Sequence, residues 1–268
     1  MTVPMNETRA PGRLEAMATQ ALSALGTALT FLAEAVAHIA QGRINWRLTL
    51  AQTAAIGFDS APMSIIICLV AGSVLALQTA AKFAQTGADA YVGGLVALAI
   101  VREIGPIFTC MAVGARAGTA IAAEIANMKV TEQIDALTTM NVSPVRYLFV
   151  PRLLACVVAL PLLTIVDSLI AIIGGMLIAQ NVSYLHYSKY LESVWLYLKP
   201  YDIRVSLIKS MIFGVILAAI CCTIGLTTRG GAKDVGEATT RAAVWTVVAI
   251  LIADFFLTWM FFGSSFQK

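Results

Sequence analysis

The sequence predicts an all-α, polytopic membrane protein in which an amino-terminal helix at the membrane interface precedes five transmembrane helices. Of the 268 residues, 59% are hydrophobic and 12% are charged, against roughly 25% charged in an ordinary globular chain, and the mean hydropathy is +0.83. The apolar residues also gather into stretches of about 20, the length that crosses a bilayer core. A net charge of +3, scattered along the chain, excludes an extended nucleic-acid-binding surface.

The amino-terminal region, residues 14–50, is expected to lie on the membrane rather than to cross it. Residues 1–13, which precede it, are polar and contain prolines, so we expect a cytoplasmic tail. Residues 14–40 have apolar positions at helical spacing, but Glu34 and His38 interrupt them, and basic and aromatic residues follow. This pattern is typical of an amphipathic interfacial helix, with an imperfect sixth span as the alternative.

Five apolar stretches follow within residues 60–262, which we treat as one membrane domain. Arg102 and Glu103 interrupt the second stretch, and Pro151 and Pro161 are expected to kink the third into a broken span. The expected spans are residues 62–83, 92–114, 143–180, 205–226 and 243–262.

Lysine and arginine residues are distributed unevenly between the two sides of these spans. More of them fall on the side that holds the amino terminus and the loops at about 115–147 and 227–242. The positive-inside rule therefore predicts a cytoplasmic amino terminus and an external carboxy terminus. The segment at about 181–203 then lies outside, and its Tyr and Trp residues suit a helical segment at the outer membrane surface.

The five cysteines are expected to be buried, unpaired thiols. They lie within apolar stretches and lack the C-x-x-C or Cys/His spacing of metal sites and disulfide frameworks. The sequence also lacks G-x-x-x-x-G-K-[ST], the loop that binds ATP phosphates. We therefore expect no catalytic residue, metal or cofactor in this chain, and any ATP-driven activity requires a separate ATPase.

Small residues and two charges mark the end of the second stretch. Gly114 and Gly118, four residues apart, allow another helix to approach closely. Arg116 and Glu124 lie about 12 Å apart along a helix, too far for a direct ion pair. Each is therefore expected to find a separate partner or to face solvent.

A short helix is expected next, at about residues 131–141. Thr131 is the expected N-cap, and Asn141 is expected to end the helix. The bilayer does not require such a helix, so we interpret it as a docking site for a cytosolic partner, with a simple connector as the alternative. The expected contact residues are Glu132, Gln133, Ile134, Asp135 and Leu137.

Charged residues inside spans are energetically unfavourable and mark cavities or partner contacts. Arg102 and Glu103 are adjacent, so on a helix they point about 100° apart and pair poorly with each other. Lys209 is expected to reach inward to Glu103 or outward to the headgroups. Our hypothesis is that the three line a central cavity that opens externally, where they hold an anionic lipid headgroup or organise its entrance. The alternative is that they form ion pairs that lock helices together.

Asp167 and Asp254 are the acidic residues of the third and fifth spans. Two membrane aspartates can form an intramembrane protease dyad. These two lie on non-adjacent spans and lack flanking glycine motifs suited to such a site. We expect each to form hydrogen bonds with a neighbouring helix, and we assign Asp254 to helix packing.

Two sequence elements resemble the MlaE (YrbE) permease family of bacterial lipid ABC transporters. They are Arg-Glu-x-Gly-Pro at 102–106 and Ala-Glu-x-x-x-Met-x-x-x-Glu-Gln at 123–133, and the similarity extends over about residues 60–262. The resemblance implies a homodimer whose subunits each have an amino-terminal interfacial helix and five spans. It also implies a coupling helix, here Glu132 to Leu137, that rests on a cytosolic ABC ATPase.

The resemblance further implies transfer of phospholipid between the bacterial inner membrane and a periplasmic MCE-domain protein, which maintains outer-membrane lipid asymmetry. The partner ATPase, with a small accessory subunit, would bind ATP and Mg²⁺. A lipid cavity at the dimer interface is also implied, with Val74, Leu75 and Leu77 as candidate apolar walls. The alternatives are a proton-coupled secondary transporter of lipids or other hydrophobic compounds, with Glu103 and Asp254 as proton sites, and an intramembrane hydrolase.

Overall fold

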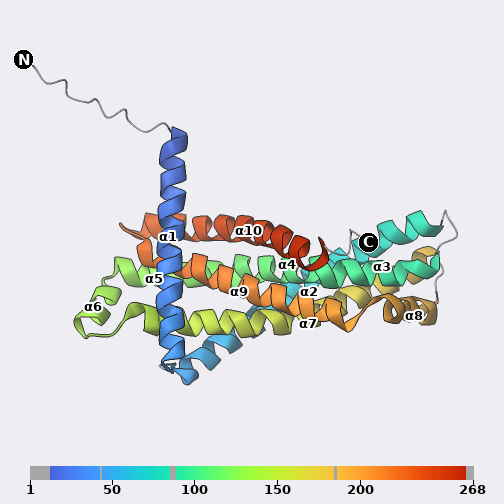
Figure 1. Cartoon of the computed structure of the whole chain (residues 1–268), viewed down its shortest axis with the longest axis horizontal. Coiled ribbons are helices and arrows are strands. Elements are labelled where there is room, and N and C mark those ends of the chain that lie inside the picture. The colour runs from blue at the N-terminus through green and yellow to red at the C-terminus, as the bar shows by residue number, and fades with distance from the viewer. Residues whose placement is uncertain (1–12, 43, 85–88, 184–185, 264–268) are drawn as a thin grey trace, which may run out of the picture.

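The computed structural model describes residues 13–42, 44–84, 89–183 and 186–263, and this part of the chain contains helices and no strand (Figure 1). The expected tail lies almost wholly outside the described residues. Five apolar helical segments are long enough to cross a membrane, as predicted, so the chain is a multi-pass membrane protein. They are Trp46–Phe83, Val92–Val130, Val145–Val182, Pro200–Thr227 and Ala232–Phe262.

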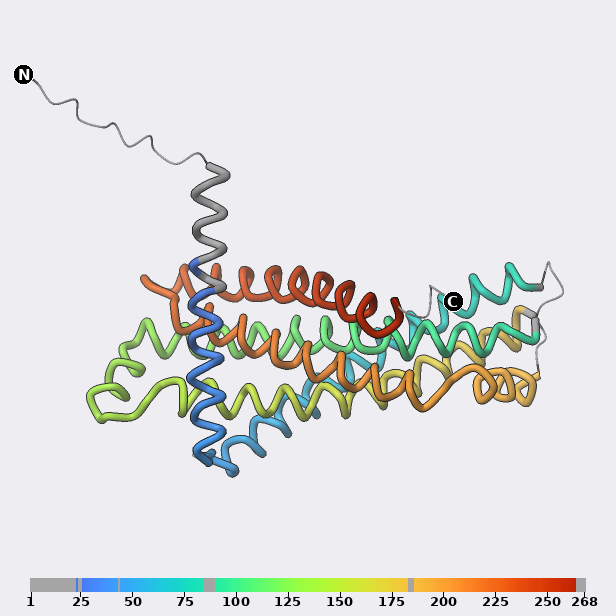
Figure 2. Tube along the Cα trace, viewed as in Figure 1, coloured from blue at the N-terminus to red at the C-terminus, as the bar shows by residue number. Residues whose placement is uncertain are grey.

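The first helix, α1 (Arg13–Ala40), runs across the bundle, whereas the five long segments run along it (Figures 1 and 2). Its inner face packs against the core, where Ala35 is fully buried and Leu32 is partly buried. Leu29 and Val36 are exposed. A helix that crosses the direction of the spans and exposes apolar side chains is suited to a membrane surface, which favours the interfacial placement over a sixth span.

The first span, α2 (Trp46–Ala84), begins well before the expected start at residue 62. Asp59 lowers the local hydropathy, but Ile56 is buried and the helix runs on through Pro62. Tertiary packing thus extends the helix beyond the apolar stretch that predicts it.

The second span is one continuous helical rod that ends at Val130 rather than at 114, so the expected loop at 115–147 is mostly helix. Two π-helical turns interrupt the rod, one at Arg102 and Glu103 and the other between Gly114 and Gly118, the pair that we call the glycine ridge. Such turns are frequent at functional sites. After the 3₁₀ helix η1 (Asp89–Tyr91), the rod consists of α3 (Val92–Ala99), η2 (Ile100–Ile104), α4 (Gly105–Val113), η3 (Gly114–Gly118) and α5 (Thr119–Val130).

The expected short helix is present as α6 (Gln133–Thr139), but it begins differently than predicted. Thr131 is not its N-cap, because the hydroxyl of Thr131 donates to the carbonyl oxygen of Asn127 at 2.8 Å, within the last turn of α5. The residue before α6 is instead Glu132, whose backbone is left-handed with a φ of 60°. The chain therefore changes direction at Glu132, after the hydroxyl of Thr131 has been used to close α5.

Asn141 ends α6 as predicted. Its φ of 60° lies in the left-handed region, which Asn adopts more readily than most residues. The amide of Asn141 donates to the carbonyl of Thr138, and the amide of Val142 donates to the carbonyl of Leu137, both at 3.0 Å. These two bonds form a Schellman motif, which satisfies the last carbonyls of the helix and turns the chain back toward the third span.

The third span is continuous and not broken. The π-helical turn η4 (Val145–Phe149) leads directly into α7 (Val150–Ser183), and Pro161 lies inside that helix. A proline removes one backbone donor, but α2 packs against α7 and supports it. The remaining helices are α8 (Tyr187–Tyr197), α9 (Pro200–Thr227) and α10 (Ala232–Phe262).

Buried apolar side chains form two clusters. One includes Ile134 of α6, and we call it the α6-end core; the other includes Tyr190 of α8, and we call it the α8-end core. All five cysteines are free and buried, which confirms that they are small buried side chains. Cys68 belongs to the α8-end core, and the α6-end core contains Cys110, Cys156, Cys221 and Cys222.

Close packing makes one glycine of α2 difficult to replace. A Cβ added to Gly72 would collide with the backbone of Ala171 on α7, whereas one added to Gly57 would meet nothing within 4 Å. Because backbone atoms cannot rotate aside, Gly72→Ala is expected to lower the free energy of unfolding by about 1–3 kcal/mol. Titration from a mild detergent into SDS measures this. Gly57→Ala, the control, is expected to be neutral or slightly stabilising, and equal losses in both variants would contradict the prediction.

Candidate functional site

Side chains from three helical segments meet at Lys209 of α9, which is fully buried. Its Nζ lies 2.9 Å from Oε2 of Glu103 on η2 and 2.9 Å from Oδ1 of Asp254 on α10. It also donates to Oγ1 of Thr258 at 2.7 Å and to the carbonyl of Arg102 at 3.0 Å. An ammonium group has three protons, so these acceptors saturate it. Lys209 therefore reaches inward to Glu103; we call this group the Lys209 network.

Thr258 is a member of this network that the sequence reasoning missed. Its hydroxyl accepts from Lys209 and donates to the carboxylate of Glu103, with oxygen–oxygen distances of 3.0 and 3.1 Å. Thr258 lies four residues after Asp254 and so on the same face of α10. That spacing from a buried aspartate was the signal available in the sequence.

Arg102 pairs with a residue that was not predicted. Its Nε and Nη2 each lie 2.8 Å from Oδ1 of Asp202, near the start of α9, and its guanidinium lies over the ring of Phe262 at 4.3 Å. The other carboxylate oxygen of Asp202 accepts the amide of Lys199 at 3.0 Å, so the same side chain caps the helix. The structure thus brings Glu103 and Lys209 together but gives the side chain of Arg102 a separate partner.

The charges gathered at this site change the roles that we expected for Arg102, Glu103 and Lys209. The Lys209 network and the Arg102–Asp202 pair formally hold two cations and three carboxylates. An anionic headgroup is therefore not attracted by net charge, and Lys209 is buried and saturated. Arg102, whose side chain is 36% exposed, is the cation of this group that a ligand can reach. Lys209 therefore fits the alternative expectation, in which ion pairs hold the helices together.

A pocket of about 230 Å³ adjoins the Lys209 network. Arg102 and Glu103 line it, but Lys209 does not. Pockets for drug-sized ligands have volumes of about 300–1,000 Å³, so this one is smaller than a typical site for a whole ligand. The lining residues are Leu98, Ala99, Arg102, Glu103, Thr258 and Phe262.

Val74, Leu75 and Leu77 of α2 are not among the residues that line this pocket. The side chains of Val74 and Leu77 are exposed, and Leu75 packs partly buried against the α8-end core. Exposed apolar side chains on a membrane helix contact lipid or another protein. The role of these residues as cavity walls between two subunits stays a prediction.

The glycine ridge faces α9. A Cβ added to Gly114 would lie 3.4 Å from a methyl group of Leu217, and one added to Gly118 would lie 3.1 Å from Sγ of Cys221. The small residues therefore let α9 lie close to the rod.

Arg116 and Glu124 do not pair with each other, and each has a partner on a different helix. Nη2 of Arg116 lies 3.6 Å from Oδ2 of Asp59 on α2, with both side chains largely exposed. Oε2 of Glu124 lies 2.7 Å from Nη2 of Arg152 on α7, and the Arg152 side chain is only 4% exposed. Arg152 also donates to the carbonyl of Leu148 at 3.1 Å. The second pair therefore ties α5 to a buried cation.

Asp167 and Asp254 bind different partners. Asp167 is fully buried and accepts hydrogen bonds from Ser64 of α2 at 3.2 Å and from Thr109 of α4 at 2.7 Å. Asp254 belongs to the Lys209 network. Each aspartate thus joins neighbouring helices, and no hydrogen bond between the two occurs among the described residues, so nothing in the geometry favours a protease dyad.

The helix α6 is anchored on one side and free on the other. Ile134 is buried in the α6-end core, and Leu137 is partly buried. Glu132, Gln133 and Asp135 are exposed, with Oδ1 of Asp135 held 2.7 Å from Nζ of Lys129. The exposed polar face is available to a partner at the end of the bundle opposite α8 (Figure 1).

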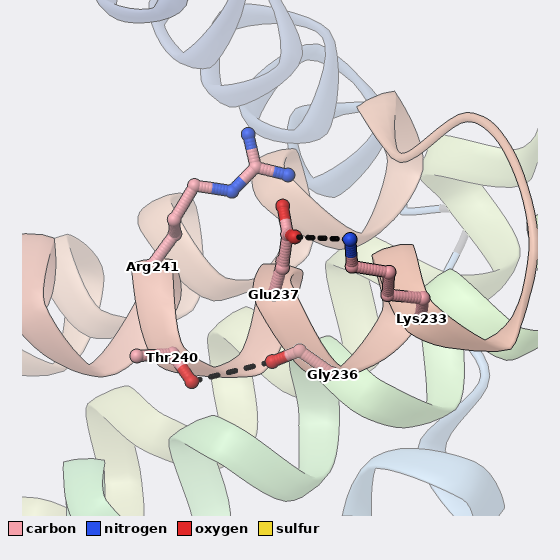
Figure 3. A pocket seen from close by; sticks show the side chains of 5 residues that line it. All are labelled: Lys233, Gly236, Glu237, Thr240 and Arg241. Carbon is pink, nitrogen blue, oxygen red and sulfur yellow. Dashed lines mark hydrogen bonds and ion pairs between the residues drawn. The ribbon is translucent and has the colours of Figure 1, made fainter.

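A second hollow, of about 410 Å³, lies along the first turns of α10 (Figure 3). Lys233 and Glu237 approach to 4.0 Å within it, and Lys233 is 89% exposed. Such a surface ion pair contributes about 0–1 kcal/mol. Because one helix supplies every lining residue, this is a solvated helix face and not an enclosed site. The lining residues are Lys233, Gly236, Glu237, Thr240 and Arg241.

Comparison with known proteins identifies the family. The family model described as Permease MlaE matches residues 49–260, which is most of the chain. The chain belongs to the MlaE permease family. The matched region contains α6, the glycine ridge and the whole Lys209 network. As an MlaE permease, it is a non-catalytic, multi-pass membrane protein.

Three relatives of this MlaE permease cover most of its length. A "Probable ABC transporter permease protein" of Synechocystis sp. is 42% identical over 85% of this chain and 87% of its own. "Protein TRIGALACTOSYLDIACYLGLYCEROL 1, chloroplastic" of Arabidopsis thaliana is 38% identical over 87% of this chain and 66% of its own. A "Probable ABC transporter permease protein" of Rickettsia felis is 37% identical over 89% of this chain and 92% of its own.

Proposed function

We propose that this chain is the membrane subunit of an ABC transporter that moves phospholipids between the bacterial inner membrane and a periplasmic MCE-domain protein, and so maintains outer-membrane lipid asymmetry. The observation that carries the proposal is a partly apolar pocket, lined by the accessible guanidinium of Arg102, inside a membrane permease. The names of the relatives support it, since two are ABC transporter permeases and the third name contains that of a glycolipid.

The pocket suits one part of a phospholipid. The guanidinium of Arg102 contacts Asp202 through Nε and Nη2 and offers its remaining donors to a phosphate oxygen, and Leu98 and Phe262 offer apolar contacts. A whole lipid needs more space, which a second copy of the chain would supply. The helix α10, which contributes to the pocket, also exposes a row of large apolar side chains that suits contact with that copy or with lipid: Ile252, Phe255, Phe256 and Trp259.

The partner ATPase binds α6 through exposed residues such as Glu132 and Asp135. The helix α5 directly precedes α6 and is the last part of the continuous rod, which also contains Arg102 and Glu103. A displacement of α6 is therefore carried along one helix to the pocket. ATP hydrolysis moves lipid only if the affinity of the pocket for lipid differs between the two states.

In this proposal the protein lies in the inner membrane. The α6 end and the amino terminus are cytoplasmic, beside the ATPase and its small accessory subunit. The α8 end and the carboxy terminus are periplasmic, facing the MCE-domain protein. ATP and Mg²⁺ are bound by the ATPase.

Purification from the native membrane tests the proposal. We expect an ABC ATPase, an MCE-domain protein and phospholipid to accompany the chain in protein and lipid mass spectrometry. In vesicles, lipid transfer is expected to require ATP hydrolysis and to survive collapse of a pH gradient. Transfer that follows the proton gradient without an ATPase would favour the proton-coupled alternative, with Glu103 and Asp254 as proton sites.

A further inference from the structure

The helix α1 contacts the segment that joins α6 to the third span. Ser143, which lies two residues after Asn141, donates its hydroxyl to Oε1 of Glu34 on α1 at 3.0 Å. The same Oε1 lies 3.5 Å from Nε2 of His38, one turn further along α1. The hydroxyl oxygen of Ser143 also accepts the amide of Arg146, in η4, at 3.4 Å. One side chain thus links the end of the α6 loop, η4 and α1.

Apolar packing reinforces this link. Ala35, the neighbour of Glu34, is fully buried in the α6-end core, and Phe31 and Ile39 pack against the same core. Ile134 of α6 belongs to that core, and α1 packs directly on η4. The residues of η4 that lie in this core are Val145, Leu148 and Phe149.

The segment between the end of α6 and Ser143, where α1 makes contact, is short, and its backbone is restricted. The Schellman motif at Asn141 fixes the end of α6, and Pro144 restricts the backbone just before η4. The π-helical turn η4 follows at once, and such turns are frequent at functional sites. A displacement of α6 therefore reaches Ser143 within a few residues and meets α1 there.

We infer that α1 moves together with α6 during transport, and that Glu34 and Ser143 are positioning residues that transmit the displacement. The inference rests on the proposed function, because it requires an ATPase on α6. The exposed apolar side chains of α1, Leu29 and Val36, suit contact with the lipid of the adjacent leaflet. Movement of α1 then displaces the membrane lipid that these side chains contact.

The complete transporter, reconstituted with its ATPase in phospholipid vesicles, tests this with spin labels. One label replaces the exposed Val36 on α1, and the other replaces Val158, which is exposed on α7. We expect the distance between the labels to change between the ADP-bound state and a trapped ATP-bound state. A distance that stays the same while lipid is transferred overturns the inference.

Two hydroxyl variants test the transmitting residue. Ser143→Ala is expected to lower the lipid transferred per ATP hydrolysed by about threefold, because it removes the partly solvated hydrogen bond to Glu34 together with the longer one from the amide of Arg146. The control is Thr239→Ala on α10, since the Thr239 hydroxyl donates to the Gly236 carbonyl of its own helix, and we expect no change. Equal effects of the two variants overturn the role of Ser143.

A disulfide tether adds an independent test. A Glu34→Cys/Ser143→Cys protein, oxidised in the complete transporter, is expected to keep ATP-driven lipid transfer, because the two positions move together. Loss of transfer on oxidation, restored by dithiothreitol, overturns the inference. An unaltered transporter that shows no ATP-dependent transfer of lipid instead refutes the proposed function, so the two failures are distinguishable.

Discussion

Replacing Lys209 with methionine is expected to lower the free energy of unfolding by about 3–5 kcal/mol and to stop ATP-driven lipid transfer. Methionine keeps much of the side-chain volume but removes the ammonium group that lies 2.9 Å from both Glu103 and Asp254. Two carboxylates then remain within the membrane without their cation, which is the reason for the large effect. Titration into SDS measures stability, and the vesicle assay measures transfer.

Two further variants separate the roles of this network. Lys233→Met removes a lysine that is 89% exposed, and it is expected to change stability by less than about 1 kcal/mol. The triple variant Lys209→Met/Glu103→Gln/Asp254→Asn leaves no unpaired charge in the network and is expected to regain most of the stability. If it also regains full transfer, the charges serve only to hold the helices together. A Lys209→Met protein as stable as the unaltered one would contradict the role of the network.

The Glu124→Ala variant is expected to show the second large effect, a loss of about 3 kcal/mol in the free energy of unfolding. It leaves the guanidinium of Arg152, whose side chain is 4% exposed, without a carboxylate partner. Because Glu124 lies on α5, the segment that leads to α6, we also expect ATP hydrolysis to become less tightly coupled to lipid transfer. Titration into SDS and the ratio of lipid transferred to ATP hydrolysed measure the two effects.

The other ion pair on the same rod supplies the matched control. Arg116 and Asp59 lie 3.6 Å apart with side chains that are 45% and 59% exposed. Arg116→Ala is therefore expected to cost less than about 1 kcal/mol. The variant Glu124→Gln keeps an oxygen acceptor for Arg152 and is expected to lose less stability than Glu124→Ala. Equal losses for Glu124→Ala and Arg116→Ala would show that burial of Arg152 does not matter.

The helices themselves were largely predictable, because hydropathy and helical periodicity are local properties of the chain. The five apolar spans, the amino-terminal helix and the short helix closed by Asn141 all occur in the structure. The ends of the helices were less predictable. The first span begins at Trp46 and the second runs to Val130, because packing buries residues such as Ile56 and Ile125 beyond the most apolar stretches.

The candidate site was predictable only in part. The rarity of charge inside spans pointed to Arg102, Glu103 and Lys209, since each unpaired charge in a membrane is unfavourable. It did not reveal that Asp202 forms an ion pair with Arg102 or that Thr258 joins the Lys209 network. Asp202 was hidden at the start of an apolar helix, and threonine is common enough in membrane helices to carry no signal alone.

Hydropathy alone was enough to predict five apolar spans, and two short motifs were enough to indicate the family. These properties follow from composition, spacing and local motifs. Only the tertiary structure decided which charges pair, because the partners lie about a hundred residues apart: Glu103 with Lys209, and Arg102 with Asp202. Helix packing selects those partners, and so it made Lys209 a strut between helices and left Arg102 at the pocket.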